Sequence, residues 1–452
     1  AAPLMVGGRL FINMPTSSGA AVDARTGDTL WVYNPKTYEA GTTTMTARWN
    51  QRGVAYWSDG EAERVFWGTS NGYLICVEAA SGRPCADFGE NGRVDLMRDI
   101  PRADRDERDW LNALLYSVQS PPIVVGDTVI TPASISSYNI TREAPPGWMR
   151  GFDPRTGRTK WTFHTIPQGD EFGNDTWGGD SWRVTGKVGV WSMMSADAEL
   201  GLLYLPTNTA APDYYGGHRP GDNLFGESLV AVDLETGERV WHFQTTHHDI
   251  WDWDIPVPPI LVDVTVDGVD IPAVVQTTKQ TFVYAFNRET GEPIWPIPET
   301  PVPPGDVPGE WYSPTQPIPS RPAGYELQGL TVDDLIDFTP ELRAMAIEQV
   351  SDIKLGPIFT PPVLSRADGP IATLGLGAGS GGTNWPGGAY DPATQIVYVP
   401  SRTAFYSWEL IPSPGPDVSD MRYVKGTPMY GVGHGGLRAL NVRGLSLSKP
   451  PY

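Results

Sequence analysis

Short apolar runs separated by polar turns recur along most of the chain, and one hairpin pattern appears four times. In each copy an apolar run leads to Asp or Asn, a Thr-Gly pair follows, and a second apolar run contains a tryptophan eight positions after the Asp or Asn. Asp or Asn favours the start of a turn and glycine accepts a positive φ, so the pattern predicts a β-hairpin with one fixed tryptophan contact. The copies start at Asp23, Asp153, Asp233 and Asn287, and a fifth copy at 78–82 lacks the tryptophan.

A second apolar piece lies upstream of the hairpins and is followed by a turn and another apolar run. Each repeat therefore contains about four short strands. Four-stranded units in series with a repeated tryptophan predict an all-β fold, a β-propeller of four-stranded blades. A β-sandwich is the alternative, but it would not repeat one hairpin signature so regularly. The upstream pieces lie at 3–6, 122–125, 259–262 and 362–364.

The repeats predict about six blades and a partial seventh within one β-propeller domain covering residues 1–452. Because an open propeller leaves sheet edges bare, we expect the chain to be a truncated form of a larger closed ring. The expected blades span 1–37, 40–100, 115–165, 188–243, 255–297 and 355–410, with the partial blade after 435.

Two stretches interrupt the repeat. Residues 98–109 form a charged stretch that predicts a surface loop, and a proline-rich stretch opens an insertion at 296–355. Within the insertion, Thr339 followed by Pro340 predicts the start of a short helix, because Thr caps helices and Pro suits the first turn. Its apolar side would consist of Leu342, Met345, Ala346 and Val350.

The net charge and the apolar content of the chain exclude some classes of binding partner. The 452 residues include 50 Gly and 44 Pro, as expected for many turns, and carry a net charge of −20. So acidic a chain repels nucleic acid and anionic lipid, so we expect neither as a partner. No apolar run of 18 residues occurs, so no membrane span is predicted. The chain has no signal peptide but begins inside a strand pattern, which suggests a processed or trimmed product.

The chain has two cysteines, Cys76 and Cys85, on either side of the turn at 79–82. If they lie opposite each other across a hairpin, a cross-strand disulfide can form. The alternative is two small buried thiols. A disulfide would fit an oxidising compartment such as the periplasm.

Chemistry-bearing residues concentrate at 247–254, where three aspartates and two tryptophans follow two histidines, and Lys279 comes later. A carboxylate among indoles is partly desolvated, so its proton affinity can be tuned. A nearby ammonium group or metal cation can keep it ionised and ready to accept a proton. The structural alternative is a tight loop in which the aspartates cap turns and the tryptophans pack.

The tryptophan repeat, the loop at 251–254 and Lys279 together resemble the dehydrogenases that depend on pyrroloquinoline quinone (PQQ). The resemblance spans nearly the whole chain and implies a ring of eight blades. It suggests that Arg52 pairs with the cofactor carboxylates, that Trp191 stacks under the cofactor and that Asn384 and Trp385 contact it. The matching segments lie at 50–57, 191–192, 207–208, 327–342, 355–362 and 382–385.

The chemistry of the cofactor agrees with these residue types. A planar ring favours an aromatic platform such as Trp191, and carboxylates favour a guanidinium such as Arg52. The resemblance makes Asp252 the general base and Lys279 the hydrogen-bond donor to the reactive carbonyl. It also implies a bound Ca²⁺, with Mg²⁺ or a lanthanide as alternatives, held by Asn208, Asp252 and Asp254. The structural alternatives are a surface role for Arg52, blade packing for Trp191, a turn cap for Asn208 and a solvated Lys279.

Departures from the family pattern indicate a branch. The alcohol-oxidising members have two adjacent cysteines, which this chain lacks, and usually an arginine where it has Lys279. The metal-binding glutamate of the third blade is also absent from 133–139, where Ser136 or Asn139 could add an oxygen ligand. The lysine and the missing cysteine pair resemble the glucose, quinate and sugar-alcohol branch.

The expected function is therefore periplasmic, PQQ-dependent oxidation of a sugar or polyol hydroxyl. No Cys-x-x-Cys-His motif for covalent haem occurs, so electrons would pass to an external quinone or a small redox protein. One alternative is an alcohol dehydrogenase of the same fold. The other is a non-catalytic propeller scaffold that binds protein partners across one face.

Overall fold

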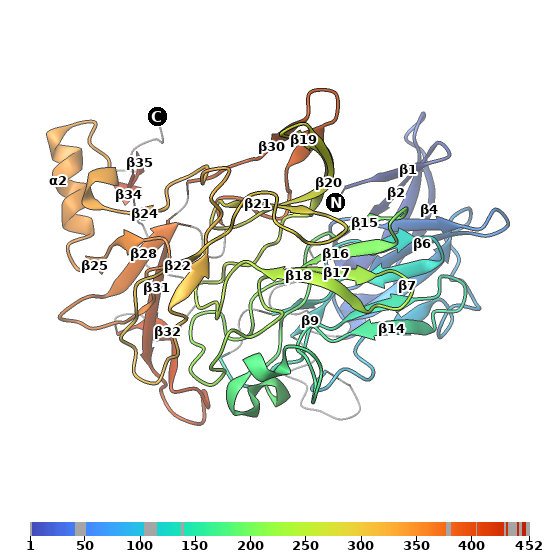
Figure 1. Ribbon diagram of the computed structural model, residues 1–452. Coiled ribbons are helices and arrows are strands. Elements are labelled where there is room, and N and C mark those ends of the chain that lie inside the picture. Colours follow the sequence, from blue (N-terminus) through green and yellow to red (C-terminus); the bar gives the residue numbers. More distant parts are fainter. Residues whose placement is uncertain are drawn as a thin grey trace.

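The computed structural model describes residues 2–40, 51–103, 115–136, 140–376, 381–403, 405–428, 431–432, 441–442 and 445–448. Short strands carry most of the regular structure, with the N-terminal blades on one side of the molecule and helix α2 on the other (Figure 1). Short 3-10 helices connect some strands: η1 (Pro15–Ser17), η2 (Thr37–Ala40), η3 (Asn174–Thr176), η4 (Gly178–Arg183) and η5 (Val332–Asp334).

Four antiparallel sheets of four strands each run in sequence order, which confirms the predicted blades. The central strands of the second to fourth blades are buried at nearly every position, because each of these blades packs against neighbours on both faces. The first two blades are β1 (Leu4–Val6), β2 (Arg9–Asn13), β3 (Gly19–Asp23) and β4 (Thr29–Tyr33), then β5 (Ala55–Ser58), β6 (Glu63–Gly68), β7 (Tyr73–Glu78) and β8 (Arg93–Asp95). The next two are β10 (Ile123–Val125), β11 (Thr128–Thr131), β13 (Met149–Phe152) and β14 (Thr159–Phe163), then β15 (Ser195–Asp197), β16 (Leu202–Pro206), β17 (Ser228–Asp233) and β18 (Arg239–Gln244).

The fifth blade has three strands, and smaller pairs lie around it. Its sheet is β19 (Ile260–Val266), β20 (Val269–Thr277) and β21 (Val283–Asn287). A further hairpin pairs β29 (Ala389–Asp391) with β30 (Ile396–Tyr398). Further pairs are β9 (Tyr116–Ser117) with β12 (Ser134–Ile135), β22 (Glu299–Pro301) with β23 (Thr315–Pro317), β24 (Gly329–Leu330) with β26 (Gly356–Pro357), and β34 (Asn441–Val442) with β35 (Leu445–Ser446).

The prediction of a sixth four-stranded blade over 355–410 is wrong. Here β28 (Ala372–Leu376) pairs antiparallel with β31 (Phe405–Pro412), which continues to β32 (Tyr423–Thr427) and β33 (Gly431–Val432). Two short strands join this sheet in parallel: β25 (Ile353–Lys354) beside β28 and β27 (Val363–Leu364) beside β31. The stretch contains no Thr-Gly turn, so nothing local closes its strands into successive hairpins.

The repeated tryptophan joins each blade to the next. The indole N–H of Trp31 donates to Ala79 O at 3.0 Å, that of Trp161 to Leu234 O at 2.9 Å, and that of Trp241 to Arg288 O at 3.1 Å. Each acceptor lies in the turn of the following blade, and each indole ring also covers the glycine of that turn. Those glycines are Gly82, Gly237 and Gly291. The fixed tryptophan therefore sets the contact between successive blades.

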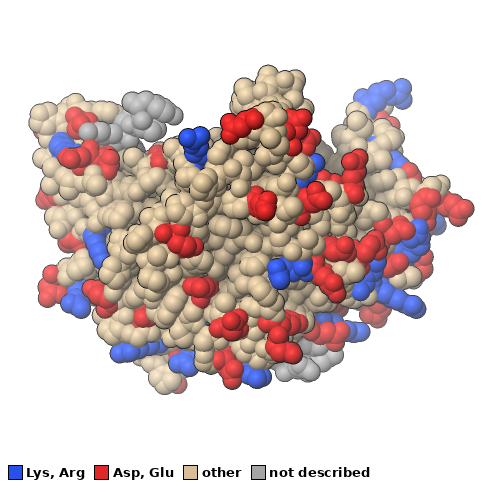
Figure 2. Space-filling view, in the orientation of Figure 1, with Lys and Arg blue, Asp and Glu red and all other residues tan. Residues whose placement is uncertain are grey.

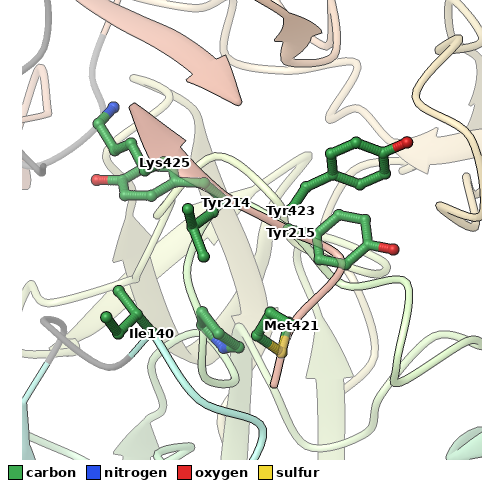
Figure 3. A pocket seen from close by; sticks show the side chains of 8 residues that line it. Ile140, Tyr214, Tyr215, Met421, Tyr423 and Lys425 are labelled. Carbon is green, nitrogen blue, oxygen red and sulfur yellow. The ribbon is translucent and has the colours of Figure 1, made fainter. Parts of the chain in front are cut away.

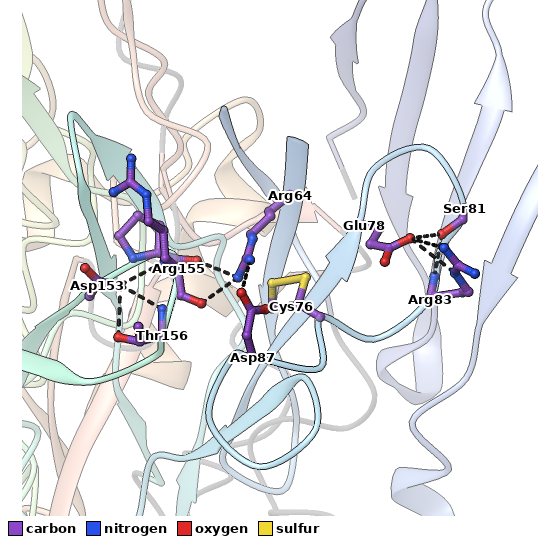
Figure 4. Close-up of a disulfide and its surroundings, with 11 residues drawn as sticks. Arg64, Cys76, Glu78, Ser81, Arg83, Asp87, Asp153, Arg155 and Thr156 are labelled. Atoms are coloured by element: carbon purple, nitrogen blue, oxygen red, sulfur yellow. Dashed lines mark hydrogen bonds and ion pairs between the residues drawn. A yellow bond between two sulfur atoms is a disulfide. The ribbon is translucent and has the colours of Figure 1, made fainter. Parts of the chain in front are cut away.

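The second blade has no tryptophan after its turn, so other side-chain contacts join it to the third blade. Its Cys76 forms a disulfide with Cys85, with the two Cα atoms 5.7 Å apart. The glycine of the third blade's turn faces the side chain of Phe88 where an indole would otherwise lie. The guanidinium of Arg64 donates to Arg155 O at 2.7 Å and pairs with Asp87, which ties the two blades together (Figure 4).

The predicted short helix is α2 (Pro340–Gln349), and Thr339 Oγ1 accepts a hydrogen bond from Leu342 N, as a capping residue does. The predicted apolar side is also confirmed, since Ala346 and Val350 are buried in one cluster with Leu447 from the C-terminal strands. Of the predicted surface loop at 98–109, residues 104–109 lie outside the described part of the chain.

Acidic side chains are spread over the face drawn in Figure 2, with basic side chains interspersed among them and no continuous basic patch. This distribution agrees with the net charge of −20. Within the described ranges, no helix is long and apolar enough to cross a membrane.

Two glycine substitutions test the docking of the tryptophans. Gly237 has φ +71°, and an added Cβ would lie 2.6 Å from Trp161 Cδ2, whereas Gly27 occupies the same turn with φ +80° and no heavy atom within 4 Å. Gly27→Ala should lower the free energy of unfolding by about 1–2 kcal/mol through backbone strain alone. Gly237→Ala should lose roughly a further 1–3 kcal/mol by displacing the indole. Denaturant unfolding of both variants measures the difference; equal losses would contradict the docking.

Candidate active site

Propeller topology gathers connections from different blades at one end. In an antiparallel blade, the connection into the first strand and the connection out of the second lie at the same end. Arg52 precedes β5, Trp191 precedes β15, Asp252 and Asp254 precede β19, and Trp385 precedes β29. Asn208 and Lys279 each lie two residues after a second strand, β16 and β20. The sequence-predicted site residues therefore all lie on the same end of their blades.

The guanidinium of Arg52 lies against two indoles. Its Cζ is 5.2 Å from the ring centroid of Trp191 and 5.0 Å from that of Trp385. Arg52 Nη1 also donates to Gln119 Oε1 at 3.1 Å, and Ser120, within 3.4 Å of it, donates to the carbonyl of Trp191 at 2.7 Å. Three loops distant in sequence thus hold one cation between two aromatic faces.

Burial lowers the pKa of Arg52 to about 10, which leaves the side chain charged at neutral pH. The hydrogen-bond acceptors of this guanidinium are the neutral groups of Gln119 and Ser120, and no ion pair joins it to another described residue. A half-buried cation flanked by aromatic faces favours an anionic, planar ligand. Beside it, Asn384 Oδ1 accepts from Trp385 N at 2.7 Å, so the asparagine orients the exposed indole.

Trp191 also connects this cation to the aspartate loop. Its indole N–H donates to Asp254 Oδ2 at 3.0 Å, and the same oxygen accepts from Lys279 Nζ at 3.0 Å. Asp254 Oδ1 accepts from Thr209 N at 2.9 Å. Burial alone would raise the pKa of Asp254, but Lys279, other cations and these hydrogen bonds lower it overall. A continuous series of contacts therefore runs from Arg52 to Lys279.

Asp252 lies next to the same lysine. Its Oδ1 is 3.4 Å from Lys279 Nζ, and its carbonyl accepts from Nζ at 2.7 Å. Burial raises the pKa of Asp252 above the ordinary range of an aspartate, and the lysine opposes that effect. The residue has φ +62°, a conformation that aspartate tolerates better than most residues. A carboxylate with raised proton affinity suits a group that accepts a proton at neutral pH.

The alternative of a purely structural loop, in which the aspartates cap turns and the tryptophans pack, fits some of the residues at 247–254 and not others. Trp251 and Trp253 stack with ring centroids 5.0 Å apart, and both are buried. Asp249 accepts from the backbone N–H groups of both tryptophans at 3.0 Å, as a turn cap does. Asp252 and Asp254, in contrast, face lysines. Packing of the tryptophans thus fixes the loop that carries the carboxylates of Asp252 and Asp254.

Sequence analysis missed a second buried lysine. Lys187 is 1% exposed; its Nζ lies 2.6 Å from Asp213 Oδ1 and 3.8 Å from Asp252 Oδ1. Burial would lower the pKa of Lys187, but the surrounding carboxylates raise it above its ordinary value. The only signal in the sequence is a lysine just before the apolar run that leads to Trp191. We refer to Lys187, Asp213, Asp252, Asp254 and Lys279 as the lysine–aspartate cluster.

Two of the three candidate metal ligands, Asn208 and Asp254, accept hydrogen bonds from N–H donors, whereas the third, Asp252, has its Oδ1 3.4 Å from Lys279 Nζ. Asn208 Oδ1 accepts from Gly189 N at 2.6 Å, and both oxygens of Asp254 accept hydrogen bonds. Among the described residues, no group of three or more His, Cys, Asp or Glu side chains is arranged to hold a metal ion. Of the two added candidates, Ser136 is buried and Asn139 lies outside the described residues.

A small pocket lies near the lysine–aspartate cluster (Figure 3). Lys425 Nζ, at one side, is 4.2 Å from the ring centroid of Tyr214 and 4.4 Å from that of Tyr406. Burial, with a contribution from Asp252, raises the pKa of Tyr214. The lining is otherwise apolar or aromatic: Ile140, Pro212, Tyr215, Met421, Tyr423 and Val424.

Comparison with known proteins places this geometry in context. Residues 1–452 match the profile of the PQQ glucose/ethanol/alcohol dehydrogenase β-propeller domain. The chain is 31% identical over 96% of its length to quinoprotein glucose dehydrogenase A of Acinetobacter calcoaceticus, covering 55% of that protein. It is 28% identical over 100% of its length to the quinate/shikimate dehydrogenase (quinone) of Acinetobacter baylyi, covering 57% of it.

Solved structures share the fold. A quinohemoprotein alcohol dehydrogenase from Pseudomonas putida superposes with a TM-score of 0.64 at 24% identity, over 91% of this chain and 52% of that one. A europium-containing methanol dehydrogenase gives a TM-score of 0.61 at 20% identity, over 94% of this chain and 64% of that one. The chain thus spans a little over half the length of the curated relatives it matches.

Removing the shared lysine should destabilise the protein. Lys279→Met leaves Asp252 and Asp254 buried with one cation fewer, which should lower the free energy of unfolding by roughly 3–5 kcal/mol. Lys36→Met, at a side chain 61% exposed, should change it by about 0.5 kcal/mol or less. Unfolding in guanidinium chloride, followed by tryptophan fluorescence, measures both. Similar midpoints for the two variants would show that the buried pairs contribute little.

Proposed function

Because the chain belongs to the family of PQQ-dependent glucose, ethanol and alcohol dehydrogenases through its β-propeller domain, we propose that it oxidises a sugar or polyol hydroxyl with PQQ. The observation that carries this proposal is the series of contacts from Arg52 through Trp191 and Asp254 to Lys279. It brings a carboxylate-binding cation, an aromatic platform and a buried acid–base pair to one end of the blades. The proposal takes residues 1–452 as one catalytic domain, with the insertion at 296–355.

The residues fit the cofactor. Arg52, held between Trp191 and Trp385 and bonded only to neutral groups, would pair with the cofactor carboxylates. The indole of Trp191 would provide the aromatic face, and Lys279 and Asn384 would donate hydrogen bonds to its oxygens. When bound, PQQ would supply an ortho-quinone that accepts a hydride, and with it two electrons, from the alcohol carbon.

Asp252 would take the proton of the substrate hydroxyl. Its Oδ1 lies 3.4 Å from Lys279 Nζ and 3.8 Å from Lys187 Nζ, and these ammonium groups oppose the rise in pKa that burial causes. Trp251 and Trp253 hold the loop and exclude water from its inner side. Loss of the hydroxyl proton to Asp252 and of hydride from the same substrate leaves a carbonyl product.

The site fits the expected Ca²⁺, Mg²⁺ or lanthanide ion less well than it fits PQQ. Ammonium groups lie 3.0 Å from Asp254 and 3.4 and 3.8 Å from Asp252, the carboxylates that would bind a divalent cation, and their charge repels it. No step of the proposed reaction therefore depends on a metal ion.

The names of the relatives support the substrate class. Two are named as a quinoprotein glucose dehydrogenase and a quinate/shikimate dehydrogenase (quinone). Both substrates carry several hydroxyl groups, and the second name gives a quinone as acceptor. We therefore propose a quinone acceptor here, with a small redox protein as the alternative. The Cys76–Cys85 disulfide supports a periplasmic location, because disulfides persist in oxidising compartments.

A substrate panel tests the function. The purified chain, incubated with PQQ, should reduce a quinone-like dye with glucose, quinate, glycerol or sorbitol and far less with ethanol. Ethanol as the best substrate would indicate the alcohol dehydrogenase alternative instead. Failure to bind PQQ would favour the non-catalytic scaffold.

Arg52→Met should weaken PQQ binding about 10- to 100-fold, because a charge-assisted hydrogen bond contributes roughly 1.5–3 kcal/mol. A titration that follows quenching of tryptophan fluorescence by PQQ measures the Kd. Arg25→Met changes an exposed arginine of the first blade and serves as the control. Equal affinity of the two variants would remove Arg52 from the cofactor site.

Asp252→Asn should lower kcat about 10²- to 10⁴-fold, the usual contribution of a general base, while PQQ still binds. Steady-state dye reduction and the fluorescence titration separate these effects. The amide has nearly the size of the carboxylate but cannot accept the proton. A variant that keeps most of the wild-type kcat would assign the proton transfer to another group.

A further inference from the structure

Lys187 occupies a position that the proposed reaction does not by itself explain. The residue is 1% exposed, and its Nζ lies among carboxylates, 2.6 Å from Asp213 and 3.8 Å from Asp252. A lysine this deeply buried is rare unless it is paired. Asp213 is also 1% exposed, so the pair places one positive and one negative charge beside the candidate base.

The backbone around Lys187 is held in an unfavourable conformation. Lys187 has φ +67° and Val188 has φ +44°, and a β-branched residue rarely adopts such values. Backbone hydrogen bonds fix the segment, because Lys187 N donates to Pro145 O at 2.9 Å and Gly147 N donates to Lys187 O at 2.6 Å. Strain of this kind persists only where the surrounding structure imposes it, and it gathers at functional sites. Here it directs the ammonium group toward Asp213 and Asp252.

The charges of the lysine–aspartate cluster bear on whether the site can bind a metal ion. Lys187 and Lys279 together bring two positive charges to the three aspartates, the same charge that one divalent cation brings. An ammonium group only donates hydrogen bonds and cannot act as a metal ligand. Asn208 Oδ1, the third candidate ligand, accepts a hydrogen bond from Gly189 N at 2.6 Å. A solved structure with this fold is named as a europium-containing methanol dehydrogenase, so a protein with this fold can hold a metal ion.

From this geometry we propose that Lys187 supplies, as a fixed ammonium group, the positive charge that a resident divalent cation would bring to Asp252, so that the chain binds PQQ without a metal ion. The proposal rests on the proposed function for its cofactor. Lys187 is a positioning residue in this account: it acts on Asp252 and does not touch the substrate. The built-in cation would keep the carboxylate of Asp252 oriented.

The first experiment compares PQQ binding by the wild-type chain in EDTA and in Ca²⁺, with fluorescence quenching as the readout. The two Kd values should agree within about twofold. Binding that weakens about tenfold or more in EDTA would overturn the proposal. So would one Ca²⁺ per chain retained by the PQQ-loaded protein after gel filtration, measured by elemental mass spectrometry.

The second experiment changes the lysine. Lys187→Met keeps an unbranched side chain that is one atom shorter but removes its charge, and PQQ binding in EDTA should weaken about tenfold or more. Lys187→Arg keeps the charge and should bind PQQ in EDTA better than Lys187→Met does. Lys36→Met, an exposed control, should match the wild type. Near-ultraviolet circular dichroism verifies that each variant is folded; a folded Lys187→Met variant with wild-type affinity in EDTA would overturn the proposal.

A third measurement needs no PQQ and so separates this proposal from the proposed function. Tb³⁺ bound near tryptophans emits sensitised luminescence, and the wild-type apoprotein is titrated with it beside Asp252→Asn. A saturable signal that Asp252→Asn abolishes would place a metal ion at the cluster and overturn the proposal. No signal, or a signal that the substitution leaves unchanged, agrees with the proposal, because the acidic surface can bind Tb³⁺ elsewhere. If PQQ binds under neither condition, the proposed function fails, while this measurement still decides whether a metal ion binds at the lysine–aspartate cluster.

Discussion

The contact between one tryptophan and the turn of the next blade is the interaction on which the rest of this structure depends. In three places an indole covers a glycine and donates its N–H to a backbone carbonyl beside it. The contact needs a flat donor on one side and a residue without a side chain on the other. Repeated along the chain, it fixes how each blade lies on its neighbour, and so it determines which loops meet at the end of the blades.

The loops that meet there bury charge, which is unfavourable unless each charge is compensated. Two lysines and three aspartates compensate one another in the lysine–aspartate cluster, and Trp191 joins them to Arg52 through Asp254. Arg52 differs because its partners are neutral, so it remains the cation most suited to an anionic ligand. The same compensation explains why a divalent cation fits poorly: its charge is already supplied by the protein.

The family relationship and the geometry answer different questions. The profile match over residues 1–452 assigns the chain to a family whose members share this propeller. The contacts indicate how the chain's own residues could hold a cofactor and take a proton. Neither determines which hydroxyl compound fits, because the relatives are matched over little more than half their length and substrate contacts vary with the loops.

The sequence by itself determined the repeating hairpins, the four regular blades, the capped helix and the loops that carry Arg52, Trp191, Asp252 and Lys279, because turns, caps and strand periodicity are local properties. It left Cys76 and Cys85 open between a disulfide and two thiols, and the structure pairs them. It did not determine the sheet around β28 and β31, whose strands pair across long connections without a local turn signal. The sequence also did not determine which charged side chains of the site lie beside one another. The partners of Lys187 lie 26 and 65 positions away along the chain, so only the packing of whole blades decides that an ammonium group lies beside Asp252.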